Sequence, residues 1–224
     1  MDKVPGEREV GDGSALDARD GDTEQRILRA ACTVFVRRGT AGARMQEIAA
    51  EAGVNQALLH YYFRSKDRLA AAVFREVAGR LVPAAMAVLG SDAALEEKVE
   101  RFVHLYIDTV RRHPFLPGYI LAELHHHPER LTTVVDPAAG QPVRLAGALL
   151  QQLGAQLRER AAAGDIRTIA PEQFVANLLA LCAIPFVARP LLRAAFGFDD
   201  AAFERFLDER RSELPGLILH GLRP

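Results

Sequence analysis

The sequence MQEIAAEAGVNQALLHYYF, residues 45–63, holds two short amphipathic segments on either side of Gly53. Apolar residues recur three and four positions apart in the first segment, which predicts a helix over 45–52 with one buried face. Gly53 predicts the end of that helix, because glycine adopts the left-handed conformation at low cost, and Asn55 is a good N-cap for a second helix. Two helices at this spacing predict a helix-turn-helix, whose second helix enters the major groove of DNA.

The second helix, expected over 56–63, has an apolar side and a polar side. Leu59 and Phe63, four positions apart, are expected to be buried, and Gln56, Ala57, His60 and Tyr61 to face outward. A glutamine near the start of a recognition helix can form two hydrogen bonds with adenine, and a small alanine can contact a thymine methyl group. An ordinary helical hairpin is the alternative interpretation, because glycine turns between helices are common in all-helical proteins.

The flanking sequence adds a third helix, because residues 23–38 are amphipathic and Gly39 follows them. The helix ending in RRG, the run QEIAAEAGV and the run LLHYYFRSKDRL together resemble the N-terminal DNA-binding domain of the TetR family of bacterial transcriptional repressors. The resemblance covers residues 23–74 and implies that Ser65 caps the next helix and that Lys66 meets a DNA phosphate.

Ten side chains are therefore expected to contact a double-stranded DNA operator. Those expected near bases are Gln46, Asn55, Gln56, Ala57 and Leu58, and those expected along the backbone are Arg44, His60, Tyr61, Tyr62 and Lys66. Three departures from the family pattern affect this set, and one of them is His60 in place of the usual first Tyr. Ala43-Arg44 replaces the usual Thr or Ser, so an N-cap worth about 1 kcal/mol is lost, and the charge of Arg44 is left to replace a phosphate contact. Gln56-Ala57 replaces the usual Lys-Gly, so the operator preference should be the chain's own.

Charge is distributed unevenly along this chain, whose formal net charge is only -1. Residues 23–75 carry nine basic and four acidic side chains, whereas residues 1–22 carry three basic and seven acidic ones. A basic segment at a helix-turn-helix is the electrostatic footprint expected for phosphate binding, and a solvated basic surface is the alternative. Residues 1–22 are rich in Gly and Asp and poor in large apolar residues, which predicts a disordered acidic tail.

The remaining sequence is long and apolar enough for a second domain, since 49% of the 224 residues are hydrophobic. Helical patterns cover residues 66–89, 94–112, 117–125, 143–163, 171–193 and 199–220, without strand signals. We therefore expect an all-α chain with a tail over 1–22, a DNA-binding domain over 23–68 and a helical ligand-binding and dimerisation domain over 69–224. Catalytic and nucleotide-binding motifs are absent from the sequence, so neither an enzyme nor a cofactor is expected.

Two long helices of the second domain suggest a homodimer interface. Leucines stand at every fourth position of 143–163 among small residues, and 171–193 is apolar nearly all round, which requires burial on more than one side. The expected interface residues are Leu145, Leu149, Leu153, Leu157, Phe174 and Leu178. A core formed within one chain is the alternative. Pro185 is expected to bend the second helix, and a two-fold dimer would read a palindrome.

The resemblance also implies an unknown small-molecule inducer that binds between the middle helices. The candidate lining residues are Phe102, Tyr106, Tyr119, Glu123 and Phe186. Core packing is the alternative for most of them, whereas Glu123 is a polar group on an otherwise apolar helix face. If the chain behaves as its relatives do, the inducer shifts the helix that starts at Lys66 and releases DNA.

Other features exclude further classes of protein. No apolar run approaches membrane-spanning length and no signal-peptide pattern is present, so a cytoplasmic protein without a membrane partner is expected. Cys32 and Cys182 are expected as free thiols. His125, His126 and His127 cannot all face one ion, so metal binding is not expected. The competing functions are an all-helical small-molecule-binding protein or enzyme without sequence-specific DNA binding, and an architectural protein that binds DNA without sequence preference.

Overall fold

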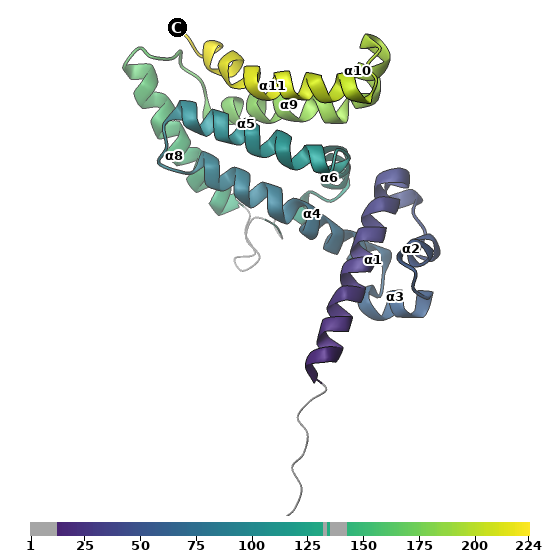
Figure 1. Cartoon of the computed structure of the whole chain (residues 1–224). Coiled ribbons are helices and arrows are strands. Elements are labelled where there is room, and N and C mark those ends of the chain that lie inside the picture. Colours follow the sequence, from purple (N-terminus) through teal and green to yellow (C-terminus); the bar gives the residue numbers. More distant parts are fainter. Residues whose placement is uncertain (1–12, 132–133, 135–142) are drawn as a thin grey trace, which may run out of the picture. The chain divides into compact units, whose positions relative to one another are not determined.

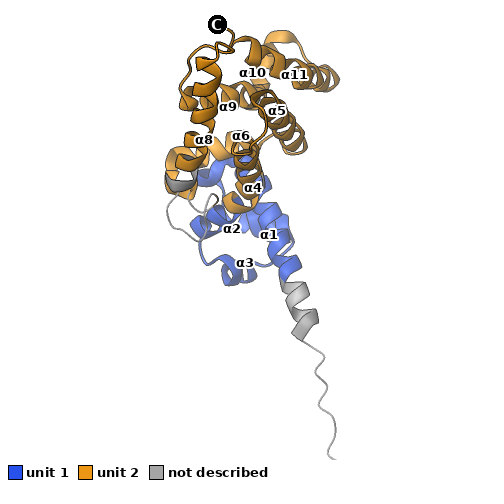
Figure 2. Ribbon diagram, turned by 90° about the vertical axis from the view of Figure 1, so that its left-hand side faces the viewer, with its two compact units in different colours: residues 1–73 blue, residues 74–224 orange. Residues whose placement is uncertain are grey.

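The computed structural model describes residues 13–131, 134 and 143–224, without the side chains of residues 13–20, 80 and 143–146. Every regular element within these residues is a helix, which confirms the predicted all-α fold (Figure 1). The chain divides into two compact units, residues 1–73 and 74–224 (Figure 2). The division lies inside helix α4 (Lys66–Leu89), a few residues beyond the boundary expected at residue 68.

The first unit consists of α1 (Gly13–Gly42), α2 (Met45–Ala52), α3 (Gln56–Phe63) and the first turns of α4. Its core is made of apolar side chains from all four helices, among them Ile27, Val34, Phe35, Ile48, Leu59, Phe63 and Leu69. These are the inner faces that the periodicity predicts. The backbone of α1 leaves helical geometry at Gly39, with φ 68° and ψ 159°, where the stop was expected.

Helix α1 begins earlier than the sequence suggested. The disordered tail expected over residues 1–22 is corrected for residues 13–22, which are helical, while residues 1–12 lie outside the described residues. The run ALDAR at 15–19 contains mostly good helix formers, and adding residues to an existing helix costs much less than starting a new one.

The second unit is a helical bundle arranged around one central helix. Besides the rest of α4 it contains α5 (Leu95–Arg112), α6 (Leu116–His126), the 3-10 helix η1 (Pro128–Leu131), α8 (Val143–Ala162), α9 (Pro171–Val187), α10 (Arg189–Phe196) and α11 (Asp200–His220). Helix α9 packs against α5, α6, α8, α10 and α11. A helix with neighbours on so many sides must be apolar on several faces, which accounts for its nearly continuous apolar sequence.

A break divides the helix expected over 171–193. Helix α9 ends at Val187, α10 begins at Arg189, and their axes differ by 67°. The bend expected at Pro185 therefore lies three residues later, at Ala188, because Pro190 suits the first turn of a new helix. No single helix in the described ranges is long and apolar enough to cross a bilayer, and only the bent α9–α10 pair passes that test by length and composition.

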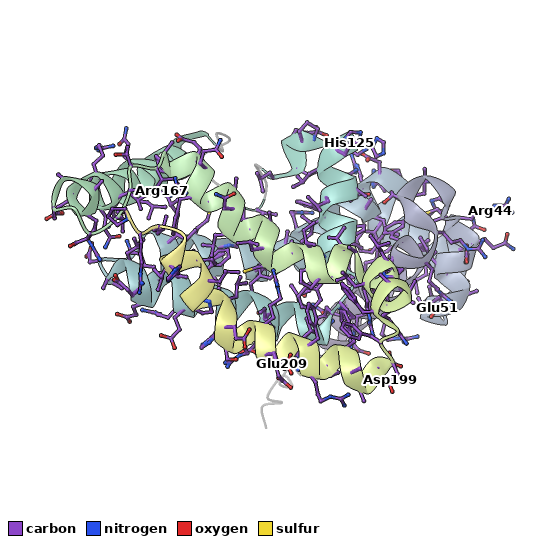
Figure 3. The ribbon with its side chains drawn as sticks, turned by 90° about the horizontal axis from the view of Figure 1, so that it is seen from above. Arg44, Glu51, His125, Arg167, Asp199 and Glu209 are labelled. Atoms are coloured by element: carbon purple, nitrogen blue, oxygen red, sulfur yellow. The ribbon has the colours of Figure 1, made fainter. Side chains whose placement is uncertain are left out.

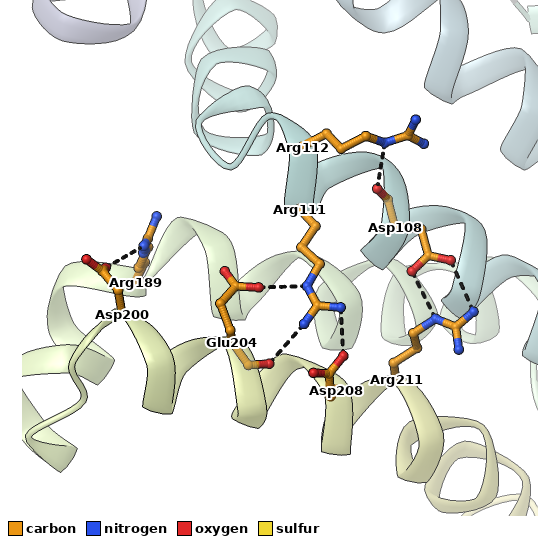
Figure 4. A network of polar contacts seen from close by, with 8 residues as sticks. All are labelled: Asp108, Arg111, Arg112, Arg189, Asp200, Glu204, Asp208 and Arg211. Atoms are coloured by element: carbon orange, nitrogen blue, oxygen red, sulfur yellow. Dashed lines mark hydrogen bonds and ion pairs between the residues drawn. The ribbon is translucent and has the colours of Figure 1, made fainter.

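Ion pairs on the surface of the second unit join α5 to α11 (Figure 4). The Arg111 guanidinium binds Glu204 Oε2 at 2.8 Å and Asp208 Oδ1 at 2.7 Å. Arg211 binds both carboxylate oxygens of Asp108, at 2.9 and 3.1 Å. Hydrogen bonding from Arg111 lowers the pKa of the Asp208 carboxyl group. The contacts fix the register of the two helices, while the buried apolar side chains between them supply most of the stabilisation.

Candidate nucleic-acid interface

The turn between α2 and α3 has the geometry that the sequence predicts. Gly53 adopts the left-handed conformation, with φ 64° and ψ 35°. The Leu58 amide donates a hydrogen bond of 2.7 Å to Asn55 Oδ1, so Asn55 caps α3. Arg44 occupies the N-cap position of α2 in an extended conformation and makes no side-chain cap, which confirms the loss expected there. The orientation of α3 is therefore fixed by local bonds at its start.

Helix α3 turns its apolar side chains inward and its polar ones outward. Leu59 is fully buried and Phe63 nearly so. The outward residues are Gln56, Ala57, His60 and Tyr61, all exposed. The Tyr61 side chain is 74% exposed, and its ring meets the half-buried Tyr62 ring edge to face at 5.4 Å between centroids. An exposed tyrosine braced by a second ring can reach a phosphate while keeping its position.

The start of α2 presents a second group of the expected DNA-contact residues. Arg44 and Gln46 are exposed and line the same shallow depression on the surface of the first unit. Figure 3 shows the Arg44 side chain extending away from the ribbon into solvent. The structure thus brings a cation and an amide together at the helix end whose usual capping residue is missing.

Lys66 lies in a different setting from the one expected. Its Nζ donates hydrogen bonds to the carbonyl oxygens of Ala41, at 2.9 Å, and Ala43, at 3.1 Å. The half-buried side chain therefore ties the start of α4 to the α1–α2 connection. Two of the three ammonium donors are used within the domain, which makes a positioning role for Lys66 at least as important as a phosphate contact.

Three further arginines of α1 hold the motif in place, and sequence reasoning missed them. Arg26 Nη2 donates to the Ala52 carbonyl oxygen at 2.8 Å, at the end of α2. Two ion pairs join α1 to the outer face of α2: Arg37 with Glu51 at 2.6 Å and Arg38 with Glu47 at 2.7 Å. The charge count for residues 23–75 included these arginines as cations available to bind DNA. Helical spacing cannot show such cross-helix pairs, because it does not define which faces of two helices meet.

Four of the six residues proposed for the dimer interface lie in the core of a single chain. Leu153, Leu157, Phe174 and Leu178 are each at most 2% exposed, and Leu149 packs partly against the same core. The side chain of Leu145 lies outside the described residues. For Leu153, Leu157, Phe174 and Leu178 the assignment is corrected, because side chains covered within one chain are not available to a second one. For Leu145 and Leu149 it stays a prediction.

The small residues of α8 also serve packing within one chain. A methyl group added to Gly154 would lie 3.2 Å from the Pro171 side chain of the same chain. The close helix approach expected from these residues therefore joins α8 to the start of α9 within one subunit. The large apolar side chains that are exposed on α9 and α11 are instead Leu179, Ile184, Val187 and Leu217.

The five inducer-site candidates are all buried in the second unit. Phe102 and Tyr106 stack with ring centroids 6.1 Å apart on α5, and Tyr119 and Glu123 stand four residues apart on α6. Phe186 comes from α9, which packs against both of these helices. Burial raises the pKa of the Tyr106 hydroxyl well above its usual range, so this group stays protonated and able to donate.

Glu123 has a partner that the sequence did not indicate. Its carboxylate forms an ion pair with Arg130 of η1, and both side chains are only 6% exposed. The interior of the second unit thus holds a buried charged pair. Arg130 was missed because it follows the helix break at His127 and Pro128, where helical periodicity no longer predicts which side chains turn inward.

The histidine run lies at a helix end. Helix α6 stops at His126, and His127 Nδ1 lies 3.2 Å from Glu129 Oε1. In the part of the chain that the structure describes, no three His, Cys, Asp or Glu residues are grouped as metal ligands. Cys32 and Cys182 are free thiols, and burial raises the pKa of both.

Comparison with known proteins agrees with this geometry. Residues 27–73 match the family model of "Bacterial regulatory proteins, tetR family". Over 103 residues the chain is 34% identical to the HTH-type transcriptional regulator BetI of Rhizobium meliloti (strain 1021), a match that covers 46% of the chain and 49% of BetI. Over 118 residues it is 36% identical to the HTH-type transcriptional repressor SCO4008 of Streptomyces coelicolor, covering 50% of the chain and 60% of that relative.

These matches span only about half the length of the curated relatives. The solved structure of SCO4942 from Streptomyces coelicolor shares the fold more widely, with a TM-score of 0.65 and 24% identity over 90% of this chain and 99% of that one. The resemblance read from residues 23–74 is therefore confirmed. The two curated relatives are a transcriptional regulator and a transcriptional repressor of the HTH type.

Proposed function

We propose that this chain, whose residues 27–73 match the family model of tetR bacterial regulatory proteins, is a homodimeric, ligand-responsive repressor of transcription at a palindromic operator. The observation that carries the proposal is the outer face of α3. Gln56, Ala57 and Tyr61 are exposed there, on a helix fixed by the Asn55 cap and by the buried Leu59. A rigid helix with adaptable polar side chains outside is what base reading in the major groove requires.

The DNA contacts divide into two classes. Gln46, Gln56, Ala57 and Leu58 are proposed to approach bases, with Asn55 acting mainly through its cap. The proposed backbone contacts are Arg44, His60, Tyr61 and Tyr62, with Lys66 supporting them through the α1–α2 connection. Contacts of the first class give sequence preference, and those of the second give affinity that falls with salt.

The test is selection of binding sites from a random duplex library by the full chain at near-physiological salt. A sequence-specific dimer should enrich a palindrome, with one dimer bound per site and an affinity that falls steeply as salt increases. Enrichment without any preferred sequence would favour an architectural protein. A folded chain that bound no duplex would favour the small-molecule-binding or enzymatic alternative.

We place the dimer interface on the exposed faces of α9 and α11, which pack side by side. Leu179, Ile184 and Val187 are 39–53% exposed on α9, and Leu217 is 61% exposed on α11. Four large apolar side chains in water on two adjacent helices are typical of a surface that a second subunit covers. A dimer is also what a palindromic site requires, because one recognition helix reads too few base pairs.

A charge placed on this surface should separate the subunits. Ile184→Glu is expected to give a folded monomer in analytical ultracentrifugation, since an unpaired carboxylate in an apolar interface is costly. Leu121→Glu is the matched control, because Leu121 is equally exposed, at 54%, on α6. If the Ile184 variant stays dimeric while the wild type is a dimer, the interface lies elsewhere.

The inducer is proposed to bind among the buried aromatic residues of α5, α6 and α9, with the Glu123–Arg130 pair as its polar contact. Ligand pockets combine apolar walls with a few polar groups, and these helices supply both. Helix α4 contains residues of both units, so a shift of α4 is the proposed route from ligand to DNA. A coupling of about 1–3 kcal/mol would lower operator affinity roughly 5- to 150-fold.

A further inference from the structure

Arg64 follows α3 in a backbone conformation that is unfavourable for its side chain. Its φ of 55° and ψ of -38° make it the one non-glycine residue with positive φ among the described residues. Most side chains avoid this half of conformational space, which glycine enters freely. The other positive-φ positions in the described ranges, including Gly39 and Gly53, are glycines. An arginine at this junction therefore departs from the chain's own pattern.

Local hydrogen bonds impose the unfavourable conformation. The Arg64 amide donates to the His60 carbonyl oxygen at 2.9 Å, and the Arg64 carbonyl oxygen accepts from His60 Nδ1 at 3.3 Å. Ser65 Oγ then accepts from the Arg68 amide at 3.2 Å and caps α4. The junction is thus held on both sides without using the Arg64 guanidinium. Strain that surrounding bonds enforce is commonly retained where the side chain serves a function.

The charge of Arg64 remains available to a partner. Its side chain is exposed, and no described carboxylate forms an ion pair with it. The neighbouring cation, Lys66, is turned toward the carbonyl oxygens of Ala41 and Ala43. Arg37 is neutralised by Glu51. The first unit therefore uses several of its cations internally and leaves Arg64 free at the end of the recognition helix.

We propose that Arg64 binds a DNA phosphate at the C-terminal end of α3, and that this contact accounts for an arginine where the backbone favours glycine. The proposal rests on the proposed function and adds a residue to it. A guanidinium suits this role because two of its N–H groups can bind two phosphate oxygens together. The contact would be independent of base sequence, since the phosphate carries no sequence information.

The test compares Arg64→Gly with the wild type in two measurements. The first is affinity for the selected operator as a function of salt, where the slope of log K against log salt should become shallower by about 0.9 for each DNA-bound subunit. The second is the melting temperature without DNA, which should rise, because glycine relieves the strain. Arg64→Lys should keep most of the salt slope, and Arg29→Gln controls for loss of one exposed charge on α1.

Opposite changes in stability and DNA affinity would support the phosphate contact, because a purely structural residue would lower both together. An Arg64→Gly variant with the wild-type salt slope would overturn this proposal and leave the proposed function intact. If Arg29→Gln made the salt dependence shallower by the same amount, the proposal would also be overturned, since loss of any exposed positive charge would then have this effect. A wild-type chain that bound no duplex would overturn the proposed function and the phosphate contact with it.

Discussion

Removing one partner of the buried Glu123–Arg130 pair should destabilise the second unit strongly. Both side chains are only 6% exposed, so neither charge can be solvated in place once the other is gone. Leaving one buried charge without its partner costs about 3–5 kcal/mol. A domain is typically stable by only about 5–15 kcal/mol, so Glu123→Gln should remove a large part of the total.

The assay is urea unfolding followed by far-UV circular dichroism, with thermal melting beside it. At about 2–4 °C per kcal/mol for a protein of this size, Glu123→Gln should melt roughly 6–20 °C below the wild type. The same substitution at Glu97 is the matched control. Glu97 pairs with Arg101 one turn along α5, but both side chains are 55% exposed, so its loss should cost less than about 0.5 kcal/mol.

The double variant Glu123→Leu/Arg130→Met separates burial of charge from packing. With both charges removed, stability should return to within about 1–2 kcal/mol of the wild type, because apolar side chains of similar size suit the same space. If Glu123→Gln cost no more than Glu97→Gln, the pair would not be buried as described. If the double variant were less stable than both single variants, the loss in the single variants would not come from a buried charge that has lost its ion-pair partner.

Three smaller effects follow from other contacts. Asn55→Ala removes the α3 cap and should lower the free energy of unfolding by about 1 kcal/mol in urea titration, whereas Asn55→Ser should keep most of it. Lys66→Met should lower the free energy of unfolding by about 1–2 kcal/mol, because two hydrogen bonds are lost, and should change the salt dependence of DNA binding little. A shallower salt dependence without a loss of stability would make Lys66 a phosphate contact instead. The Arg160 hydrogen bond lowers the folded-state pKa of Glu96, so its stabilisation is present above the unfolded-state pKa near about 4 and is lost as pH falls through the lowered value. Glu96→Gln should therefore lose less stability than the wild type on acidification, and equal losses would contradict this.

The sequence predicted local structure well wherever nearby residues determine it. The bounds of α2 and α3 follow from Gly53, Asn55 and the spacing of apolar side chains, and the structure has the same bounds. Most helices of the second unit also begin and end within one or two residues of their expected positions. These features depend on contacts three or four residues apart, which the sequence displays directly.

Prediction from the sequence was wrong or incomplete where contacts join residues far apart in the chain. Leu153 and Leu157 were expected at a dimer interface, but they are buried within one chain. An apolar stripe along a helix does not show which other helix will cover it. Lys98 lies at a buried position of α5, where its Nζ donates to Gln156 Oε1 at 2.8 Å and burial lowers its pKa. Arg130 is likewise buried by a pairing across a helix break. Long-range packing decides such cases, and no spacing rule encodes it.

The most direct test of base reading by α3 is a paired selection from random duplexes, with wild type and Gln56→Ala. Gln56 is exposed at the start of the helix, where its amide can meet one base pair in each half-site. We expect the same palindrome in both selections, with discrimination by the variant relaxed at one or two positions placed symmetrically in the two half-sites. Identical motifs from both proteins would contradict the assignment of Gln56, and the absence of any motif for the wild type would contradict sequence-specific binding itself.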